Sequence, residues 1–133
     1  MSVLIVGSTA LDSIKTPKRS NPKLLGGSAS HAAVAASFFT PTRLVGVVGD
    51  DFPKKYLNLY ERHNICTEGL QQHPGKTFHW SGEYEVNMNN RRTLATELGV
   101  FEHFTPDLPH SYQNTPYVLL PNIAPALQNH VLD

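Results

Sequence analysis

Apolar residues occur along this chain in short runs, separated by polar turns and by segments with helical spacing. Val3–Val6 is a continuous apolar run rich in β-branched residues, and it ends at a Gly-Ser pair. Arg43–Val48 is a second run of this kind. Short apolar runs without alternation are typical of strands buried on both faces of a parallel sheet. The pattern therefore predicts two core strands, each followed by a polar turn.

Two helices are predicted between and after these strands. Ser28–Phe39 contains five alanines between positions 29 and 36, and alanine favours helix while allowing close approach to a sheet. Ser28 is the expected N-cap, and Thr40-Pro41 should end the helix because a residue before proline avoids helical conformation. Phe52–His63 carries its apolar residues on one side, which predicts an amphipathic helix. Asn64 is expected to end it in a left-handed conformation.

Three other parts of the chain have different patterns. Ser8–Asp12 follows the first strand and is expected to be a polar loop, at the sheet edge where ligands collect in open α/β folds. Ile14–Leu25 has two prolines and weak periodicity, so we expect a loop or an exposed edge strand. Thr77–Tyr84 is aromatic and partly alternating, and Arg91–Leu98 is expected to pair with it across an Asn-rich turn. This hairpin should stand apart from the α/β core.

The C-terminal part of the chain predicts one more strand, Tyr117–Leu120, and the start of a helix after Ala124. Three core strands and three helices do not easily cover both faces of a parallel sheet, and such sheets need both faces covered. We therefore expect an α/β fold and expect this chain to be part of a larger α/β domain.

Composition narrows the possible functions. The 133 residues are 40% hydrophobic and 17% charged with a formal net charge of zero, so there is no electrostatic case for nucleic acid or anionic membrane as a partner. The single cysteine, Cys66, excludes an internal disulfide framework and a cysteine-based zinc site. The N-terminus lacks the basic region of a signal peptide, and no run approaches the length of a membrane span. A cytoplasmic location is expected.

Several common catalytic motifs are absent. There is no Gly-x-x-x-x-Gly-Lys-Ser/Thr, and no Gly-x-Gly-x-x-Gly follows the first strand, so nucleotide sites of those types are not expected. The seven histidines show no metal-binding spacing, so we expect no histidine metal site. Ser8, Ser28 and Ser30 lack a nucleophile elbow, which leaves acyl transfer unsupported.

Four features remain as candidates, and each has an ordinary structural alternative. Gly26-Gly27 leaves room for a ligand close to the backbone, but any tight turn into a helix might use such a pair. Asp12 is placed to accept hydrogen bonds from substrate hydroxyl groups, or it is a solvated turn aspartate. His31, in the first helical turn, faces the same ligand or is a structural or surface residue. A period-two stripe is either the buried face of a sheet or a platform for a sugar: Phe78, Trp80 and Tyr84.

Together these residues resemble the N-terminal part of the ribokinase/PfkB family of carbohydrate and nucleoside kinases. The resemblance rests on an ordered set, which is Val6-Gly7-Ser8 with Asp12, then Gly26-Gly27 opening an alanine-rich helix, then Val45–Phe52. It covers nearly the whole chain and fades after about Arg92. It implies a mostly parallel, Rossmann-like sheet flanked by helices, with a small β-sheet lid formed by segments at about 13–25 and 77–98.

The resemblance also implies an activity and a set of site residues. The activity is that of an ATP-dependent kinase, with Mg²⁺, that phosphorylates a hydroxyl of a sugar, nucleoside or related polyol. His31 stands where the family commonly has asparagine, which bears on the substrate, and Pro53 stands where a glycine is usual. The residues implied to bind substrate are Asp12, Gly26, Gly27, Ser28 and His31, with Phe78 and Trp80 in the lid.

The phosphoryl-transfer machinery of that family lies in a C-terminal Gly-x-Gly-Asp motif, which this sequence does not contain. The ATP site and the catalytic aspartate are therefore expected outside this chain, and the chain alone is expected to be inactive as a kinase. The alternative is a non-catalytic ligand-binding or dimerisation module, in which the lid-like sheet forms a homodimer contact.

Overall fold

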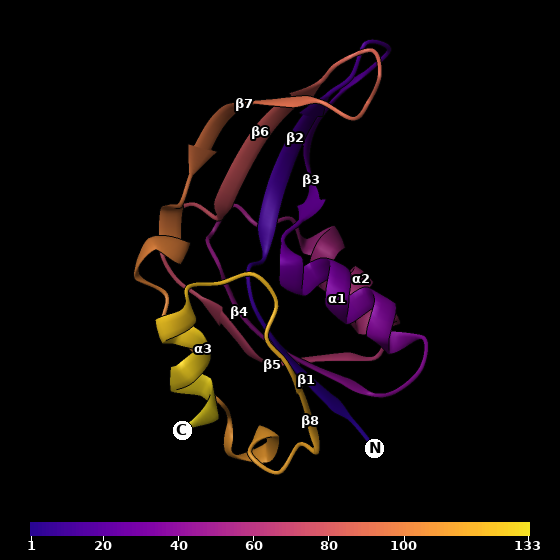
Figure 1. The fold of residues 1–133 in the computed structure, drawn as a ribbon. Coiled ribbons are helices and arrows are strands. Elements are labelled where there is room, and N and C mark those ends of the chain that lie inside the picture. The colour runs from indigo at the N-terminus through magenta and orange to yellow at the C-terminus, as the bar shows by residue number, and fades with distance from the viewer.

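Two four-stranded sheets organise the chain, and the computed structural model describes every residue from Met1 to Asp133 (Figure 1). The core sheet has the order β5-β4-β1-β8, and the projecting sheet has the order β3-β2-β6-β7. The strands are β1 (Val3–Val6), β2 (Ala10–Lys15), β3 (Ser20–Gly26), β4 (Thr42–Val48), β5 (Ile65–Gln72), β6 (Phe78–Tyr84), β7 (Arg91–Glu97) and β8 (Tyr117–Leu119). The helices are α1 (Ser28–Ser37), α2 (Lys54–Arg62) and α3 (Pro125–Leu132), with 3₁₀ turns η1 (Gly99–His103) and η2 (His110–Tyr112).

The core sheet is entirely parallel, and both faces of its centre are covered. β1 pairs with β4 and β8, and β4 pairs with β5. Side chains alternate between the two faces. Ile5 and Leu44 belong to the apolar cluster with α1 and α2, whereas Leu4 and Val45 belong to the cluster with the segment from η1 to α3. Figure 1 shows α1 and α2 on one side of this sheet and α3 on the other. The two predicted core strands are confirmed.

The third predicted strand is present as the edge strand β8, which ends at Leu119, one residue earlier than predicted. Its residues Tyr117, Val118 and Leu119 are 56%, 42% and 46% exposed. The expected C-terminal helix is present as α3, with Pro125 in its first turn, where a missing N–H costs least. The expectation of a larger α/β domain stays a prediction.

Helix α1 packs closely on the core sheet because its buried face consists of small residues. Ala29 and Ala33 are completely buried against β1 and β4. The predicted N-cap is wrong by one residue, since Gly27 is the cap and Ser28 is the first helical residue. Gly27 has a φ of 93°, a conformation that residues with a Cβ rarely adopt, which explains why a glycine precedes the helix.

Helix α2 has the predicted amphipathic face but begins later than predicted, at Lys54, because the preceding Pro53 is extended. Tyr60 is fully buried, and its hydroxyl lies 2.7 Å from the Ser30 hydroxyl of α1. Burial raises the pKa of Tyr60 to about 12, so the phenol stays neutral and joins the two helices. Asn64 has a φ of 57°, which confirms the left-handed helix end.

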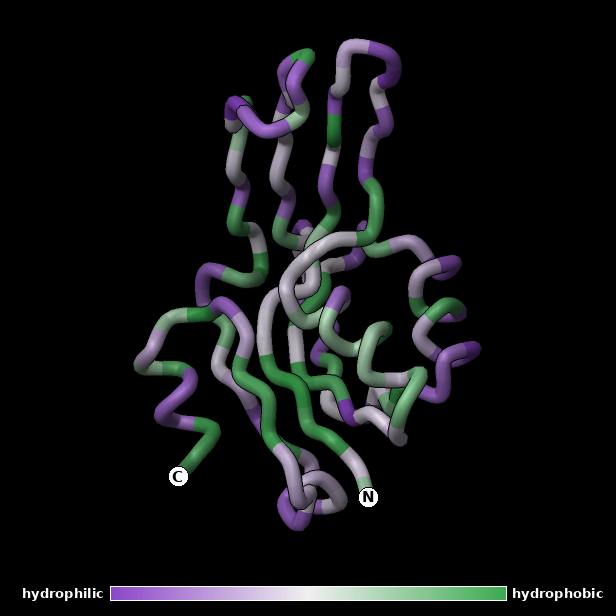
Figure 2. Tube along the Cα trace, turned by 45° about the vertical axis from the view of Figure 1, so that its right-hand side comes forward, coloured by the Kyte–Doolittle hydropathy of each residue, from purple (hydrophilic) through white to green (hydrophobic).

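The projecting sheet extends away from the helices (Figure 1). β2 pairs antiparallel with β3 and parallel with β6, and β6 pairs antiparallel with β7. The hairpin predicted from residue 77 to 98 is confirmed as β6 and β7. Figure 2 shows that the tips of this sheet are mostly hydrophilic, whereas the core strands are hydrophobic.

One part of the prediction for this sheet is wrong. The residues from Ala10 to Asp12 are not loop, because they begin β2, and β2 is an interior strand with neighbours on both sides. Its partner β6 comes much later in the chain, with Ala10 opposite Phe78 and Asp12 opposite Trp80. Such a pairing leaves no signal in the local pattern. The segment 14–25 was expected to be a loop or an exposed edge strand. Ile14 and Lys15 instead continue the interior strand β2, whereas Ser20–Gly26 is the edge strand β3.

None of the three helices is long and apolar enough to span a lipid bilayer.

Candidate functional site

A cavity of about 530 Å³ lies between the start of α1 and one face of the projecting sheet. This volume falls within the range of ligand-binding pockets, roughly 300–1,000 Å³. Six of the residues that the sequence proposed line this cavity, although they come from distant parts of the chain: Asp12, Gly27, Ser28, His31, Phe78 and Trp80. Gly26 is the one proposed residue that does not line it.

Gly26 serves the cavity indirectly, by making room for the Asp12 carboxylate. It lies opposite Ala10 in the pairing of β2 with β3, two residues from Asp12 along β2, and a Cβ on Gly26 would overlap both carboxylate oxygens of Asp12. A Cβ on Gly27 would overlap the Ser8 carbonyl oxygen. Both glycines are thus required by close packing around the turn, and Gly26 is required by Asp12 itself.

The Asp12 side chain is half-buried and accepts no hydrogen bond from another residue of the chain. Burial raises the pKa of this carboxyl, and His31 and His79 nearby partly oppose the shift. A half-buried carboxylate without donors is poorly solvated and poorly compensated. Hydroxyl groups of a ligand in the cavity would supply the missing donors.

Ser28 lines the cavity, but its polar groups are already engaged. Its hydroxyl lies 3.1 Å from the Ser8 hydroxyl and 3.3 Å from the Asn122 carbonyl oxygen, to which it donates. The Ser28 N–H donates to the Ser8 hydroxyl at 2.9 Å, and the Ala29 N–H donates to the Ser8 carbonyl at 2.9 Å. Ser8 therefore satisfies two of the N–H groups that a helix start leaves open. Through these bonds Ser28 connects the start of α1 with the turn after β1 and with the segment after β8.

His31 is exposed and lies in the first turn of α1, where it borders the cavity. Its backbone N–H donates to the Gly27 carbonyl at 3.2 Å, and no hydrogen bond of its imidazole is present. The ring is therefore free to contact a ligand.

The aromatic stripe of β6 forms the opposite wall. Phe78, Trp80 and Tyr84 share one face, as the alternation predicts, and they are partly buried beside the cavity. The Trp80 ring lies over Gly82, where a Cβ would overlap it, and its indole N–H donates to the Thr93 hydroxyl at 3.3 Å. The Arg91 guanidinium carbon lies 5.3 Å from the centre of the Trp80 ring, a cation–π distance.

The cavity is also lined by Tyr84 of the aromatic stripe and by two polar residues that the sequence had not proposed, Arg91 and Asn122. Tyr84 has the same period-two spacing as Trp80, and Arg91 lies directly opposite Tyr84 in the hairpin. The hairpin pairing was therefore a usable signal for both. Asn122 follows β8 and reaches the site only through the fold, so no local signal existed.

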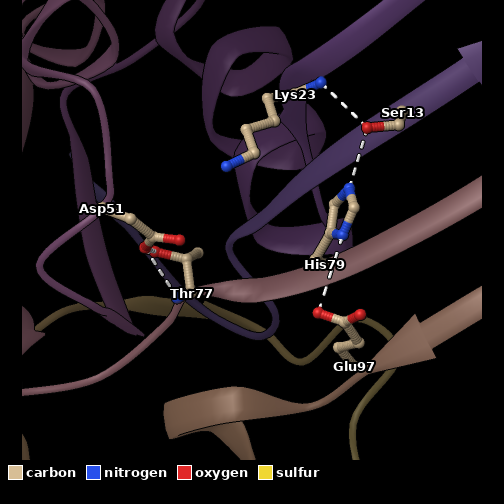
Figure 3. Close-up of polar contacts among 6 residues, drawn as sticks. All are labelled: Ser13, Lys23, Asp51, Thr77, His79 and Glu97. Atoms are coloured by element: carbon tan, nitrogen blue, oxygen red, sulfur yellow. Dashed lines mark hydrogen bonds and ion pairs between the residues drawn. The ribbon is translucent and has the colours of Figure 1, made fainter.

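Polar residues also connect the strands on the outer face of the projecting sheet (Figure 3). His79 Nε2 lies 2.8 Å from the Ser13 hydroxyl, which accepts the Lys23 N–H at 3.1 Å. His79 Nδ1 lies 4.0 Å from a Glu97 carboxylate oxygen. Ser13 and His79 alternate with the cavity residues Asp12 and Trp80, so they point to the opposite face. These contacts link all four strands without facing the cavity.

No group of three or more His, Cys, Asp or Glu side chains lies close enough to hold a metal ion.

No protein-family model and no curated protein sequence matches the chain, but many solved structures do. A Methanocaldococcus jannaschii nucleoside kinase of the ribokinase family is similar over 97% of this chain, with 22% identity and a TM-score of 0.74. A Cryptococcus neoformans ribokinase in complex with ADP is similar over 96%, with 20% identity and a TM-score of 0.73. A Burkholderia thailandensis nucleoside kinase in complex with inosine is similar over 73%, with 24% identity and a TM-score of 0.64.

The chain spans less than half of each of these proteins, namely 47%, 44% and 35% of their lengths. At these identities the similarity shows the fold. The chain has a ribokinase-like fold, with a parallel sheet flanked by helices, as the sequence predicted.

Proposed function

We propose that this chain is the substrate-binding portion of a cytoplasmic, ATP-dependent kinase that phosphorylates a hydroxyl group of a sugar, a nucleoside or a related polyol. The observation that carries the proposal is the half-buried Asp12 carboxylate, which lacks hydrogen-bond donors and borders a cavity between a ribokinase-like core and an aromatic wall. The chain is then the N-terminal part of one ribokinase-like domain, and the projecting sheet is its lid.

The cavity residues divide the binding of such a ligand between polar and apolar contacts. Asp12 accepts hydrogen bonds from ligand hydroxyl groups, and Gly26 keeps the space beside its carboxylate open. His31 contacts the ligand at the cavity border. Phe78 and Trp80 cover the apolar face of the ligand, and approach of the projecting sheet would exclude water from it.

The kinase reaction needs groups that these residues do not supply. In this proposal ATP, Mg²⁺ and the catalytic base are bound or provided by residues outside this sequence, since the sequence contains no Gly-x-Gly-Asp motif. This chain contributes the position and orientation of the hydroxyl group that reacts.

Two measurements test the proposal. Calorimetric titration with ribose, fructose, inositol and nucleosides should show saturable binding of at least one, and Asp12→Ala should weaken it strongly. Unchanged binding by Asp12→Ala would remove the proposed site. Incubation of the chain with MgATP and the same compounds should give no phosphorylated product, and clear ATP-dependent product would show that the catalytic groups are present after all.

One observation favours the second candidate function, a homodimer contact through the projecting sheet. β7 is an edge strand, all of its residues are exposed, and Leu94 on it is 53% exposed. Exposed edge strands readily pair with another chain. Sedimentation of the wild type and of Leu94→Lys tests this, since a dimer formed through β7 should dissociate in the variant.

A further inference from the structure

The turn after β4 carries two aspartates to which the proposed kinase function gives no role. Asp50 and Asp51 follow Gly49, at the carboxyl end of a core strand. Their side chains point to the segment that leads from the core sheet into the projecting sheet, from Gly75 to Thr77. This segment directly precedes Phe78, the first residue of the cavity wall on β6.

Asp51 holds Thr77 through two hydrogen bonds. The Thr77 N–H donates to Asp51 Oδ1 at 2.8 Å, and the Thr77 hydroxyl donates to the same oxygen at 2.7 Å (Figure 3). The Thr77 hydroxyl in turn accepts the Gly49 N–H at 2.9 Å. Thr77 is only 1% exposed, so these short bonds are formed where water does not compete well.

Backbone hydrogen bonds also hold Gly75 and Lys76, the two residues before Thr77. The Asp50 N–H donates to the Gly75 carbonyl at 2.9 Å, and the Val100 N–H after β7 donates to the Lys76 carbonyl at 2.8 Å. A Cβ on Gly49 would overlap the Gly75 carbonyl oxygen. The segment entering β6 therefore lies between the end of β4 and the segment leaving β7, with backbone contact on each side.

The direction of the Asp51 pKa shift is consistent with these hydrogen bonds. Burial raises the pKa of Asp51, but the hydrogen bonds from Thr77 and the Lys23 ammonium outweigh it, and the net pKa lies below the usual value. Figure 3 shows the Lys23 side chain of β3 extending on the side of Asp51. The Asp51 carboxylate thus holds the residue that enters β6 and is favoured in its charged form by Lys23 of β3.

We propose that Asp51 is a positioning residue, which acts through Thr77 to hold the projecting sheet at the angle that places its cavity face, with Asp12, Phe78 and Trp80, against Gly27 and His31 at the start of α1. The inference rests on the proposed function, because the residues it positions are those of the proposed ligand cavity. Asp51 itself does not line the cavity and does not contact the ligand.

Trp80 is the only tryptophan, so its fluorescence reports the cavity wall alone. Asp51→Ala and Thr77→Val each remove part of the contact between core and projecting sheet. In both variants we expect a lower steady-state anisotropy of Trp80 and about tenfold weaker binding of the ligand found by titration. Asp51→Asn keeps the accepting Oδ1, and Thr77→Ser keeps the hydroxyl, so both should stay within about threefold of the wild type.

The outcomes separate this inference from the proposed function. If Asp51→Ala and Thr77→Val lower thermal stability but leave Trp80 anisotropy and ligand affinity at wild-type values, the two residues only stabilise the fold and the inference is wrong. If Asp51→Ala does not fold, the same two measurements on Thr77→Val, compared with Thr77→Ser, decide whether the inference holds. Failure of Asp12→Ala to weaken binding would instead contradict the proposed function. The anisotropy measurement needs no ligand, so it tests the role of Asp51 separately.

Discussion

The core sheet and the projecting sheet have the same number of strands but differ in how far those strands are buried. β1 and the middle of β4 are buried on both faces, whereas β7 is exposed along its whole length and β3 along most of it. The core is held by two apolar clusters, one on each face. The projecting sheet is held by backbone pairing and by polar contacts between strands, such as His79 with Ser13.

This difference in packing affects the two walls of the cavity in different ways. A closely packed core keeps its backbone fixed, so the turn that carries Gly27 and the start of α1 has a defined position. The projecting sheet has no apolar core of its own, and its inner face presents aromatic residues to the cavity. Asp12, Phe78 and Trp80 lie on the projecting sheet, whereas Gly27 and His31 lie at the fixed start of α1, so a movement of the sheet would change the width of the cavity between them.

The largest effect should come from truncating the core. Leu44 is 0% exposed, so Leu44→Ala should lower the free energy of unfolding by about 2–5 kcal/mol, through lost burial and a residual cavity. Leu94→Ala, the same change on β7, should alter it by no more than about 0.5 kcal/mol because Leu94 is 53% exposed. Urea unfolding of both variants measures the contrast. Equal losses would show that the two sheets do not differ in packing as described.

A smaller effect is expected from the buried hydrogen bond between the helices of the core. Tyr60→Phe leaves the buried Ser30 hydroxyl without its partner at 2.7 Å, which should cost about 1–3 kcal/mol. Tyr84→Phe is the matched change on the projecting sheet, where no hydrogen bond of the Tyr84 hydroxyl is present and little change is expected. Thermal unfolding of the two variants compares them, and a larger loss in Tyr84→Phe would reverse the expected order.

The smallest effect concerns the pH dependence of stability at the border of the two sheets. The pKa of Asp12 is raised in the folded protein, so its contribution to stability is fully present below the usual value of 3.8 and is lost as pH rises through the raised pKa. Asp12→Asn removes this loss. The variant should therefore gain stability relative to the wild type as pH rises from about 3 to 7. A difference between the two proteins that is independent of pH would contradict the raised pKa.

The core strands and α1 were predictable from the sequence, whereas strand β2 and the cavity residue Asn122 were not. The apolar runs at Val3–Val6 and Arg43–Val48 and the alanines of α1 carry their structure in local composition. β2 was missed because its pairing with β6 joins segments far apart in the chain, and no local pattern encodes such a partner. Asn122 reaches the cavity for the same reason.

The candidate site was indicated by resemblance more than by spacing. In the sequence, Asp12 taken alone is as consistent with a turn as with a ligand contact, and the ligand contact was predicted from the resemblance that Asp12 and Gly26-Gly27 carry together. The structure then supplied the physical reason, which is that Gly26 leaves the space that the Asp12 carboxylate occupies. Ser28 shows the opposite case, since its hydroxyl is engaged with Ser8 and Asn122.

A ligand in the cavity between the start of α1 and the projecting sheet must depend on Asp12 and must be sensed by Trp80, which lies beside Asp12 on the neighbouring strand. Titration with inosine or ribose, followed by Trp80 fluorescence, tests both at once in wild type and Asp12→Asn. We expect a saturable change in the wild type and binding weakened by roughly tenfold or more in the variant, since a hydrogen bond to a charged group contributes about 1.5–3 kcal/mol. Equal affinity in both proteins, or calorimetric binding with no change in Trp80 fluorescence, would contradict a ligand site in this cavity.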